Sequence, residues 1–167
     1  MVRRNGPPQL GTLYESWPQA AGRTAPKDLF MNFLLDTNAC IALINGKPSS
    51  VRLRFQKAID TGEEALVPAV VAFELWYGVA KSKQQQANAA KVEAFFAGPV
   101  DFLPFDEDDA RVAGRIRAAT EATGKSIGAY DLLIAAQALR HKLTLVTANV
   151  REFGRVEGLL WEDWAET

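Results

Sequence analysis

Short apolar runs alternate with longer segments of helical character from Met31 onward. This alternation is expected of βα units that build a mostly parallel sheet. Strands are predicted near residues 33–35, 65–67, 100–103 and 143–146, with a weaker one near 159–161. Helices are predicted over residues 37–44, 49–60, 68–80, 84–97, 106–123 and 128–141. The pattern therefore predicts an α/β fold with a central, mostly parallel sheet of about five strands.

Several element boundaries have local physical causes. Pro68 suits the first position of a helix, where its missing N–H would have no partner in any case. Asp106 can cap the following helix, and Asp109 three residues later echoes a capping box. The helix over 128–141 has almost no polar face, so it should be covered on most sides. Asp131, in its first turn, is the exceptional residue there.

Residues 1–30 differ from the rest, because glycine and proline interrupt every candidate helix or strand in them. We expect this N-terminal extension to lie outside the fold and Met31 to begin the domain, which would span residues 31–167. The alternative is an ordered arm in which Tyr14 and Trp17 dock on the domain's own surface.

Composition limits the classes of protein that fit this chain. With 167 residues, 48% of them hydrophobic, it can form one domain with a sizeable core. The 19 lysines and arginines balance 20 acidic residues, so a nucleic-acid partner would depend on local basic patches. Cys40 is the only cysteine, which excludes an intrachain disulfide and any cysteine zinc site, and favours the reducing cytoplasm. No stretch approaches the roughly 18 consecutive apolar residues of a membrane span, so we expect no membrane partner.

Three acidic residues, Asp36, Glu74 and Asp131, stand alone in apolar stretches. Asp36 follows the first predicted strand, at the edge where an open α/β sheet places its chemistry. Two of them have simple structural alternatives: Asp36 can cap the next helix, and Asp131 can stabilise a helix N-terminus by roughly 0.3–1 kcal/mol. Glu74 lies among apolar residues in a helix that we expect to be largely buried, so it needs a partner.

The structural alternatives explain these carboxylates singly but do not explain their gathering at one sheet edge. Like charges raise one another's pKa values, and a divalent cation relieves the repulsion. Oxygen ligands suit Mg²⁺ or Mn²⁺, whereas zinc prefers histidine or cysteine, of which only His141 and Cys40 exist. His141 ends the buried helix and is not expected to take part in catalysis. Asn149, after the strand over 143–146, either orients a carboxylate or a water, or is an ordinary loop residue.

Five segments, in order, resemble the PIN-domain ribonucleases, and within them the VapC-type toxins of bacterial toxin–antitoxin pairs. The segments are Met31 to Asn38, Glu74 to Gly78, Gly128 to Ala136, Val146 to Phe153, and Gly158-Leu159 with Glu162 to Trp164. The resemblance implies a three-layer α/β/α fold and an endoribonuclease that uses Mg²⁺ or Mn²⁺. Its acidic residues carry over to Asp36, Glu74 and Asp131. At Asn149, many PIN domains have Asp and this toxin subgroup often has Asn.

The resemblance further implies a homodimer and a VapB-type antitoxin protein that can place a basic side chain among the carboxylates. In this hypothesis Asp36 and Asp131 bind the metal ion directly, Glu74 binds it directly or through water, and Asn149 positions a water. Five basic residues either hold the RNA backbone or are solvated charges: Arg111, Arg115, Arg117, Lys125 and Arg151. Four aromatic residues either form apolar docking surface or, for most of them, pack in the core: Trp76, Tyr77, Phe95 and Phe96.

Three other functions compete with RNA hydrolysis. A haloacid-dehalogenase-like phosphatase needs a second Asp two residues after the first, where this chain has Asn38. A non-catalytic PIN-type binding module would usually have lost acidic residues, whereas three are present here. A structure-specific DNA nuclease generally carries more acidic ligands and more DNA-binding elements than a chain of this length allows. The RNA-cleaving toxin is therefore the preferred interpretation.

Overall fold

The computed structural model describes residues 31–166, which form a single sheet flanked by helices. The strands are β1 (Phe33–Leu35), β2 (Ala65–Pro68), β3 (Asp101–Leu103), β4 (Thr144–Val146) and β5 (Trp161–Glu162). The helices are α1 (Thr37–Asn45), α2 (Ser49–Asp60), α3 (Ala69–Lys81), α4 (Gln85–Phe96), α5 (Glu107–Ala122), α6 (Ala129–His141) and α7 (Val150–Phe153). The expected N-terminal extension, residues 1–30, lies outside the described residues, so a domain start at Met31 stays a prediction.

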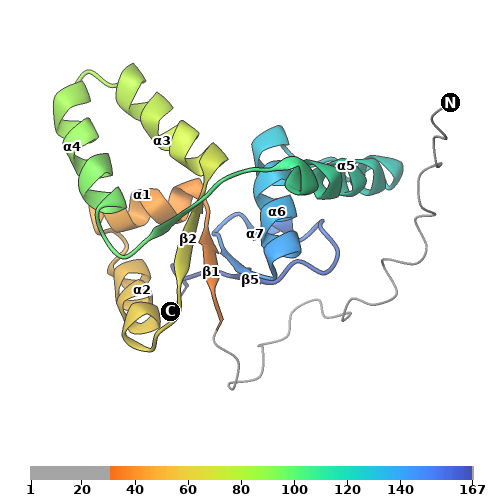
Figure 1. The fold of residues 1–167 in the computed structure, drawn as a ribbon, viewed down its shortest axis with the longest axis horizontal. Helices are drawn as coiled ribbons and strands as arrows, with labels where there is room; N and C mark the ends of the chain where they lie inside the picture. Colours follow the sequence, from red (N-terminus) through yellow and green to blue (C-terminus); the bar gives the residue numbers. More distant parts are fainter. Residues whose placement is uncertain (1–30, 167) are drawn as a thin grey trace, which may run out of the picture.

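All neighbouring strands pair in parallel, in the order β3-β2-β1-β4-β5. Phe33 of β1 is in register with Ala65 of β2 on one side and with Thr144 of β4 on the other. Figure 1 shows α1 to α4 on one side of the sheet and α5 to α7 on the other. The predicted three-layer α/β/α architecture is confirmed.

The order of the strands reverses between β1 and β4. From β1 the chain proceeds outward through β2 to β3, and it then crosses to the other side of β1 to form β4 and β5. The connections that follow β1 and β4 therefore lie on opposite faces of the sheet, as Figure 1 shows. Such a divergence leaves a crevice outside the carboxyl ends of the two strands, where open α/β sheets bind their ligands.

The core is built around β1 and α6. Every residue of β1 is fully buried, and the ring of Phe33 packs edge-on against Trp164 with 5.0 Å between the ring centroids. Helix α6 lies between the sheet and α5, and it buries Leu132, Ile134, Ala135, Ala136, Gln137 and Ala138. The prediction that this helix is covered on most sides is confirmed, and its first turn delivers Asp131 to the carboxyl edge of the sheet.

Some local expectations are wrong. Pro68 is the last residue of β2 and the N-cap of α3, not the first residue of the helix. The short helix α7 has no counterpart among the predicted elements. Helix α3 is not largely buried, because no layer covers its outer face: Phe73 is 50% exposed and Tyr77 57% exposed. Trp76 is also exposed, whereas Phe95 and Phe96 of α4 are partly buried against the core as expected.

Within residues 31–166, no helix combines the length and the apolar character that crossing a membrane would require.

Candidate active site

Asp36 occupies the position directly after β1, at the switch point of the sheet. Its Oδ1 accepts a hydrogen bond from the backbone N–H of Ala39 at 2.7 Å, so it is the N-cap of α1. The capping interpretation of the sequence is therefore confirmed, but capping uses only one carboxylate oxygen. The side chain is buried, and burial raises its pKa above the usual range, while a hydrogen bond from the Thr147 hydroxyl opposes that effect.

Glu74 reaches the same edge from the middle of α3. The Thr37 hydroxyl, one residue after Asp36, donates a hydrogen bond to its Oε2. The side chain is half-buried. The partner that we expected for Glu74 is thus the hydroxyl group of Thr37.

Asp131 lies in the first turn of α6, and Asn149 lies just after β4. The Asn149 side-chain amide donates to Asp131 Oδ2 at 3.3 Å, and the Asn149 backbone N–H donates to the Thr147 hydroxyl at 2.9 Å. Asn149 therefore contacts a candidate site carboxylate, and its role in orienting that carboxylate stays a prediction. Thr147 connects the two halves of the site, because it also contacts Asp36.

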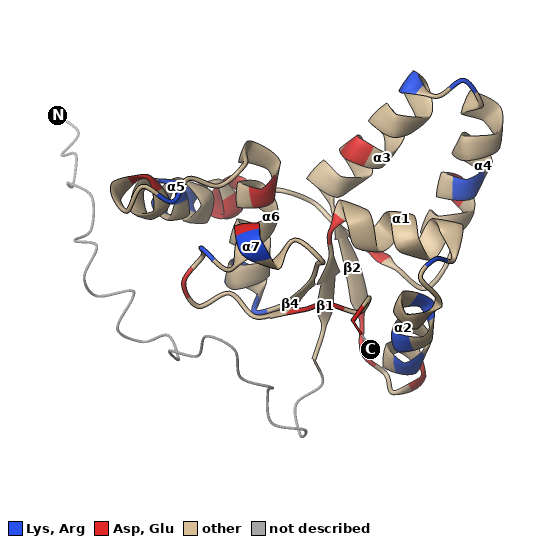
Figure 2. Cartoon of the chain, turned by 180° about the vertical axis from the view of Figure 1, so that it is seen from behind, with Lys and Arg blue, Asp and Glu red and all other residues tan. Residues whose placement is uncertain are grey.

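The charges of these side chains act on one another. Partial burial raises the pKa of Asp131 to about 6, and the negative charges of Glu152, Asp36 and Glu74 add to the increase. Acidic positions on α3, on α6 and between β1 and α1 surround the strand ends in Figure 2. The structure therefore brings Asp36, Glu74, Asp131 and Asn149 together at one edge of the sheet, from four separate segments.

The donor set suits a hard divalent cation. It consists of carboxylate, amide and hydroxyl oxygens, which Mg²⁺ and Mn²⁺ prefer. Within residues 31–166, no three acidic, histidine or cysteine side chains are already gathered tightly enough to enclose a metal ion. Mg²⁺ usually keeps several waters and takes one or two carboxylates directly. The residues therefore fit an ion held by two carboxylates and by water better than an ion enclosed by three.

Three residues of the site had no role assigned from the sequence. Thr37 and Thr147 immediately follow Asp36 and β4, so a hydroxyl at each strand end was the available signal. Glu152 of α7 acts on the charge of Asp131, but its placement depends on a helix that has no sequence pattern of its own. Among the basic candidates, Arg111 and Arg117 form ion pairs with Glu107 and Glu121 on the exposed face of α5.

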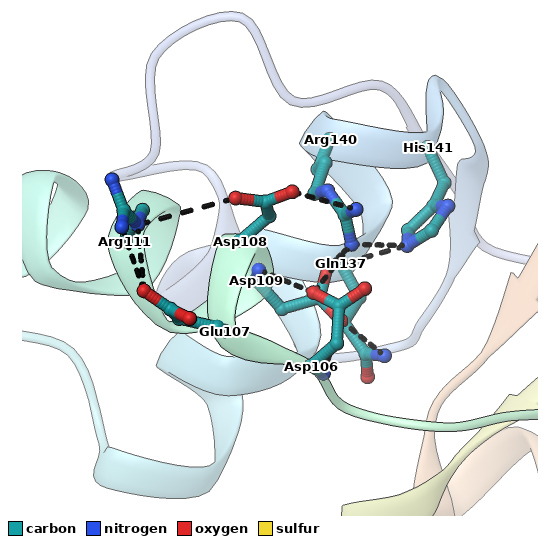
Figure 3. Close-up of polar contacts among 8 residues, drawn as sticks. All are labelled: Asp106, Glu107, Asp108, Asp109, Arg111, Gln137, Arg140 and His141. Carbon is teal, nitrogen blue, oxygen red and sulfur yellow. Dashed lines mark hydrogen bonds and ion pairs between the residues drawn. The ribbon is translucent and has the colours of Figure 1, made fainter.

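His141 lies at the opposite end of α6 from Asp131, roughly 15 Å away at 1.5 Å of rise per residue. Its Nε2 is 3.2 Å from Oδ1 of Asp109, a fully buried carboxylate at the start of α5. Figure 3 shows this second polar cluster, in which Asp109 also meets Arg140 and Gln137. His141 therefore lies at the far end of α6 from the acidic residues at the sheet edge.

A parallel, doubly wound sheet with carboxylates at its switch point defines an α/β protein with an acidic site of the kind used to bind cations. The sequence matches the PIN domain family over residues 33–159, and the chain belongs to that family. It is 41% identical to the tRNA(fMet)-specific endonuclease VapC of Shigella flexneri over 135 residues, which cover 81% of this chain and 99% of the relative. The predicted resemblance to VapC-type proteins is confirmed.

Solved structures agree with this assignment. VapBC2 from Rickettsia felis, bound to a DNA fragment from its promoter, matches with a TM-score of 0.75 and 34% identity, over 80% of this chain and 99% of that chain. DNA-bound VapBC from Salmonella typhimurium matches with a TM-score of 0.73 and 38% identity, over 80% of this chain and 98% of that chain. The described fold is thus similar to that of a chain in each of these two VapBC complexes.

Proposed function

We propose that this protein is a toxin endoribonuclease that hydrolyses RNA phosphodiester bonds with Mg²⁺ or Mn²⁺ and is neutralised by a VapB-type antitoxin. The observation that carries the proposal is the gathering of three carboxylates at the switch point of a PIN domain, where burial and, after it, the negative charges of Glu152, Asp36 and Glu74 raise the pKa of Asp131 to about 6. Repulsion of this kind destabilises the metal-free protein and is relieved by a cation. The Shigella flexneri relative is by name a tRNA(fMet)-specific endonuclease, and a Rickettsia felis relative, VapC2, is by name a ribonuclease.

The proposed roles follow from the contacts of each side chain. Asp36 and Asp131 hold the ion directly, and Glu74 holds it directly or through water. When bound, the ion lowers the pKa of the attacking water and offsets the charge that develops on the phosphate. Asn149 keeps Asp131 oriented through its amide N–H, and Thr37 does the same for Glu74 through its hydroxyl.

Asp36 is suited to a permanent role in the site. Its Oδ1 is fixed by the backbone of α1 and its carboxylate is also bonded by Thr147, so the side chain has little rotational freedom to lose when it binds an ion. The position after β1 then sets where the scissile phosphate lies. Basic residues beyond the carboxylates, such as Arg115 and Arg151, are exposed and free to contact RNA phosphates.

The proposed protein partners follow from charge and exposed apolar area. A basic antitoxin side chain among the carboxylates would stand in for the charge of the cation. Exposed aromatic residues on α3 and α6 offer area for a homodimer or for the antitoxin: Phe73, Trp76, Tyr77 and Tyr130. Both partners, and action in the cytoplasm where the RNA substrate is found, belong to the proposal.

The test is RNA cleavage by the variant Asp36→Asn. Asn is as good an N-cap as Asp, so the fold should persist while the ionised ligand is lost. We expect the cleavage of labelled tRNA in Mn²⁺ to fall by at least about 100-fold, as it does when an electrostatic contribution of roughly 3 kcal/mol is removed. Asp60→Asn, at the exposed end of α2, is the matched control and should cleave normally.

The same assay separates the competing functions. Full activity of the Asp36→Asn variant would contradict the site assignment. Equal cleavage of a DNA oligonucleotide would favour the DNA nuclease, and RNA binding without cleavage by the unaltered protein would favour the non-catalytic module.

A further inference from the structure

Helix α6 begins without a side chain of its own to cap it. Its N-cap is Gly128, and no side chain from the first turn accepts a hydrogen bond from the backbone there. The missing acceptor comes from another element: Oε1 of Glu152, on α7, accepts from the backbone N–H of Gly128 at 2.9 Å. A carboxylate at this end of a helix is also favoured by the helix dipole.

Arg155 holds the other side of the same connection. Its guanidinium lies 3.3 Å from Oε2 of Glu152, and it donates a hydrogen bond to the backbone carbonyl of Ser126. Glu152 therefore binds the backbone at residue 128, and Arg155 binds it at residue 126. The two side chains also bind each other. Both side chains are more than two-thirds buried, at 23% and 29% exposure, so they are held in one arrangement better than surface ion pairs are.

This pair of contacts lies beside the candidate active site. A Cβ atom at Gly128 would be 3.8 Å from Oδ2 of Asp131 and 4.0 Å from Oε1 of Glu152, so the two carboxylates flank the glycine. The Gly128 carbonyl in turn accepts from the N–H of Leu132, one residue beyond Asp131. Any shift of the Gly128 backbone therefore moves Asp131 relative to Asp36, which β1 holds.

A further acidic group beside the site carboxylate Asp131 is unfavourable unless other groups compensate its charge. Glu152 has two such compensations, the Gly128 N–H and the Arg155 guanidinium, and both fix the start of α6. In the sequence, Glu152 and Arg155 are spaced at i and i+3, which allows them to form an ion pair. The backbone that they bind, at Ser126 and Gly128, precedes them by roughly 25 residues.

We propose that Glu152 and Arg155 are positioning residues that hold the N-terminus of α6, and with it Asp131, in the geometry that binds the cation. The inference rests on the proposed function, since it assigns the two residues to the same metal site. Neither residue needs to touch the ion or the RNA. Toward Gly128 the Glu152 carboxylate acts as a hydrogen-bond acceptor, a role that a neutral side-chain oxygen can also fill.

The experiment compares Glu152→Gln, Glu152→Ala and Arg155→Ala, with the exposed Glu157→Ala from the same segment as control. Mn²⁺ affinity is measured by calorimetry, and hydrogen exchange of the Gly128 amide by NMR. Glu152→Ala and Arg155→Ala should lose about 10-fold or more in Mn²⁺ affinity, the range seen when groups that orient metal ligands are removed. Glu152→Gln keeps the acceptor and should retain affinity within about threefold. Gly128 exchange should accelerate only where the acceptor is lost.

The results distinguish the alternatives. If Glu152→Gln loses as much affinity as Glu152→Ala while Gly128 stays protected, Glu152 binds the ion itself and the positioning role is wrong. If Glu152→Ala keeps both its Mn²⁺ affinity and its slow Gly128 exchange, the contacts do not position the helix. If the unaltered protein binds no Mn²⁺ and cleaves no RNA, the proposed function fails, whereas the exchange of Gly128 in Glu152→Ala still decides whether the contact holds α6.

Discussion

Asp109 offers the sharpest test of how the structure is held together. Its carboxylate is fully buried and meets four donors. Oδ2 accepts from the backbone N–H of Asp106 at 3.0 Å and from Gln137 Nε2 at 3.2 Å. Oδ1 lies 2.8 Å from Arg140 Nη1 and 3.2 Å from His141 Nε2 (Figure 3). These contacts tie the start of α5 to the C-terminal half of α6.

The variant Asp109→Asn keeps the shape of the side chain and removes its charge. In either orientation the amide turns its NH₂ group toward two donors, so about two charge-assisted hydrogen bonds of roughly 1.5–3 kcal/mol each are lost. Part of the loss is recovered, because Arg140 still pairs with Asp106 and Asp108. We therefore expect about 3 kcal/mol of destabilisation, at the lower end of the range for breaking a buried ion pair.

Urea unfolding at neutral pH measures this effect. The midpoint should fall without a change in the slope, which shows that stability and not the extent of unfolding has changed. The melting temperature should fall by roughly 6–12 °C for a change of about 3 kcal/mol. Asp108→Asn is the control, because Asp108 is exposed and lies 3.4 Å from the same guanidinium; it should cost less than about 1 kcal/mol. A loss below about 0.5 kcal/mol for Asp109→Asn would refute the assigned role of the buried carboxylate.

Three further outcomes follow from the site and the core. The pKa of Asp131 is about 6 in the folded protein and about 3.9 in the unfolded chain. The free energy of unfolding of the metal-free protein should therefore fall as the pH rises from about 4 to about 6, and should then stay constant. Urea midpoints measured across this range should change less for Asp131→Asn. Thr147→Val leaves the N–H of Asn149 and the Asp36 carboxylate without the hydroxyl, and should cost about 1–3 kcal/mol in thermal or urea unfolding, whereas Thr147→Ser should cost less. Burial raises the pKa of the Cys40 thiol well above its usual range, so a thiol reagent should label the protein only after denaturation; rapid labelling of the folded protein would contradict this burial.

The sheet could be predicted from the sequence because its signals are local. The apolar run 33–35 is bounded by the polar residues Asn32 and Asp36, and Asp106 with Asp109 forms the expected capping box. Helix α7 could not be predicted, because four residues do not complete a hydrophobic period and no side chain caps them. The exposure of Phe73 was missed, and that of Tyr77 was left open, for a related reason: an apolar residue on a helix has the same sequence pattern whether a core or a partner surface covers it.

Most contacts within the site could not be predicted from the sequence, because they join residues far apart in the chain. The order of the motifs predicts that Asp36, Glu74 and Asp131 converge, because parallel strands end at one edge. It does not predict that Thr37 bonds Glu74, or that Glu152 bonds Gly128, because each depends on how one helix lies against another. Likewise, the acidic run Asp106 to Asp109 has the composition of a solvated helix start, yet one of its carboxylates is fully buried.

The two ends of α6 together make the case for a cation. At the C-terminal end, the Asp109 carboxylate forms an ion pair with Arg140, and the ring of His141 lies within hydrogen-bond distance of it. At the N-terminal end, no lysine, arginine or histidine within residues 31–166 forms an ion pair with Asp36, Glu74 or Asp131. Their contacts are hydroxyls, an amide and backbone N–H groups, which orient carboxylates but leave their charge in place. Under the proposed function, the positive charge at this second cluster comes from outside the described residues, from a metal ion during cleavage or from a basic antitoxin side chain when the toxin is neutralised.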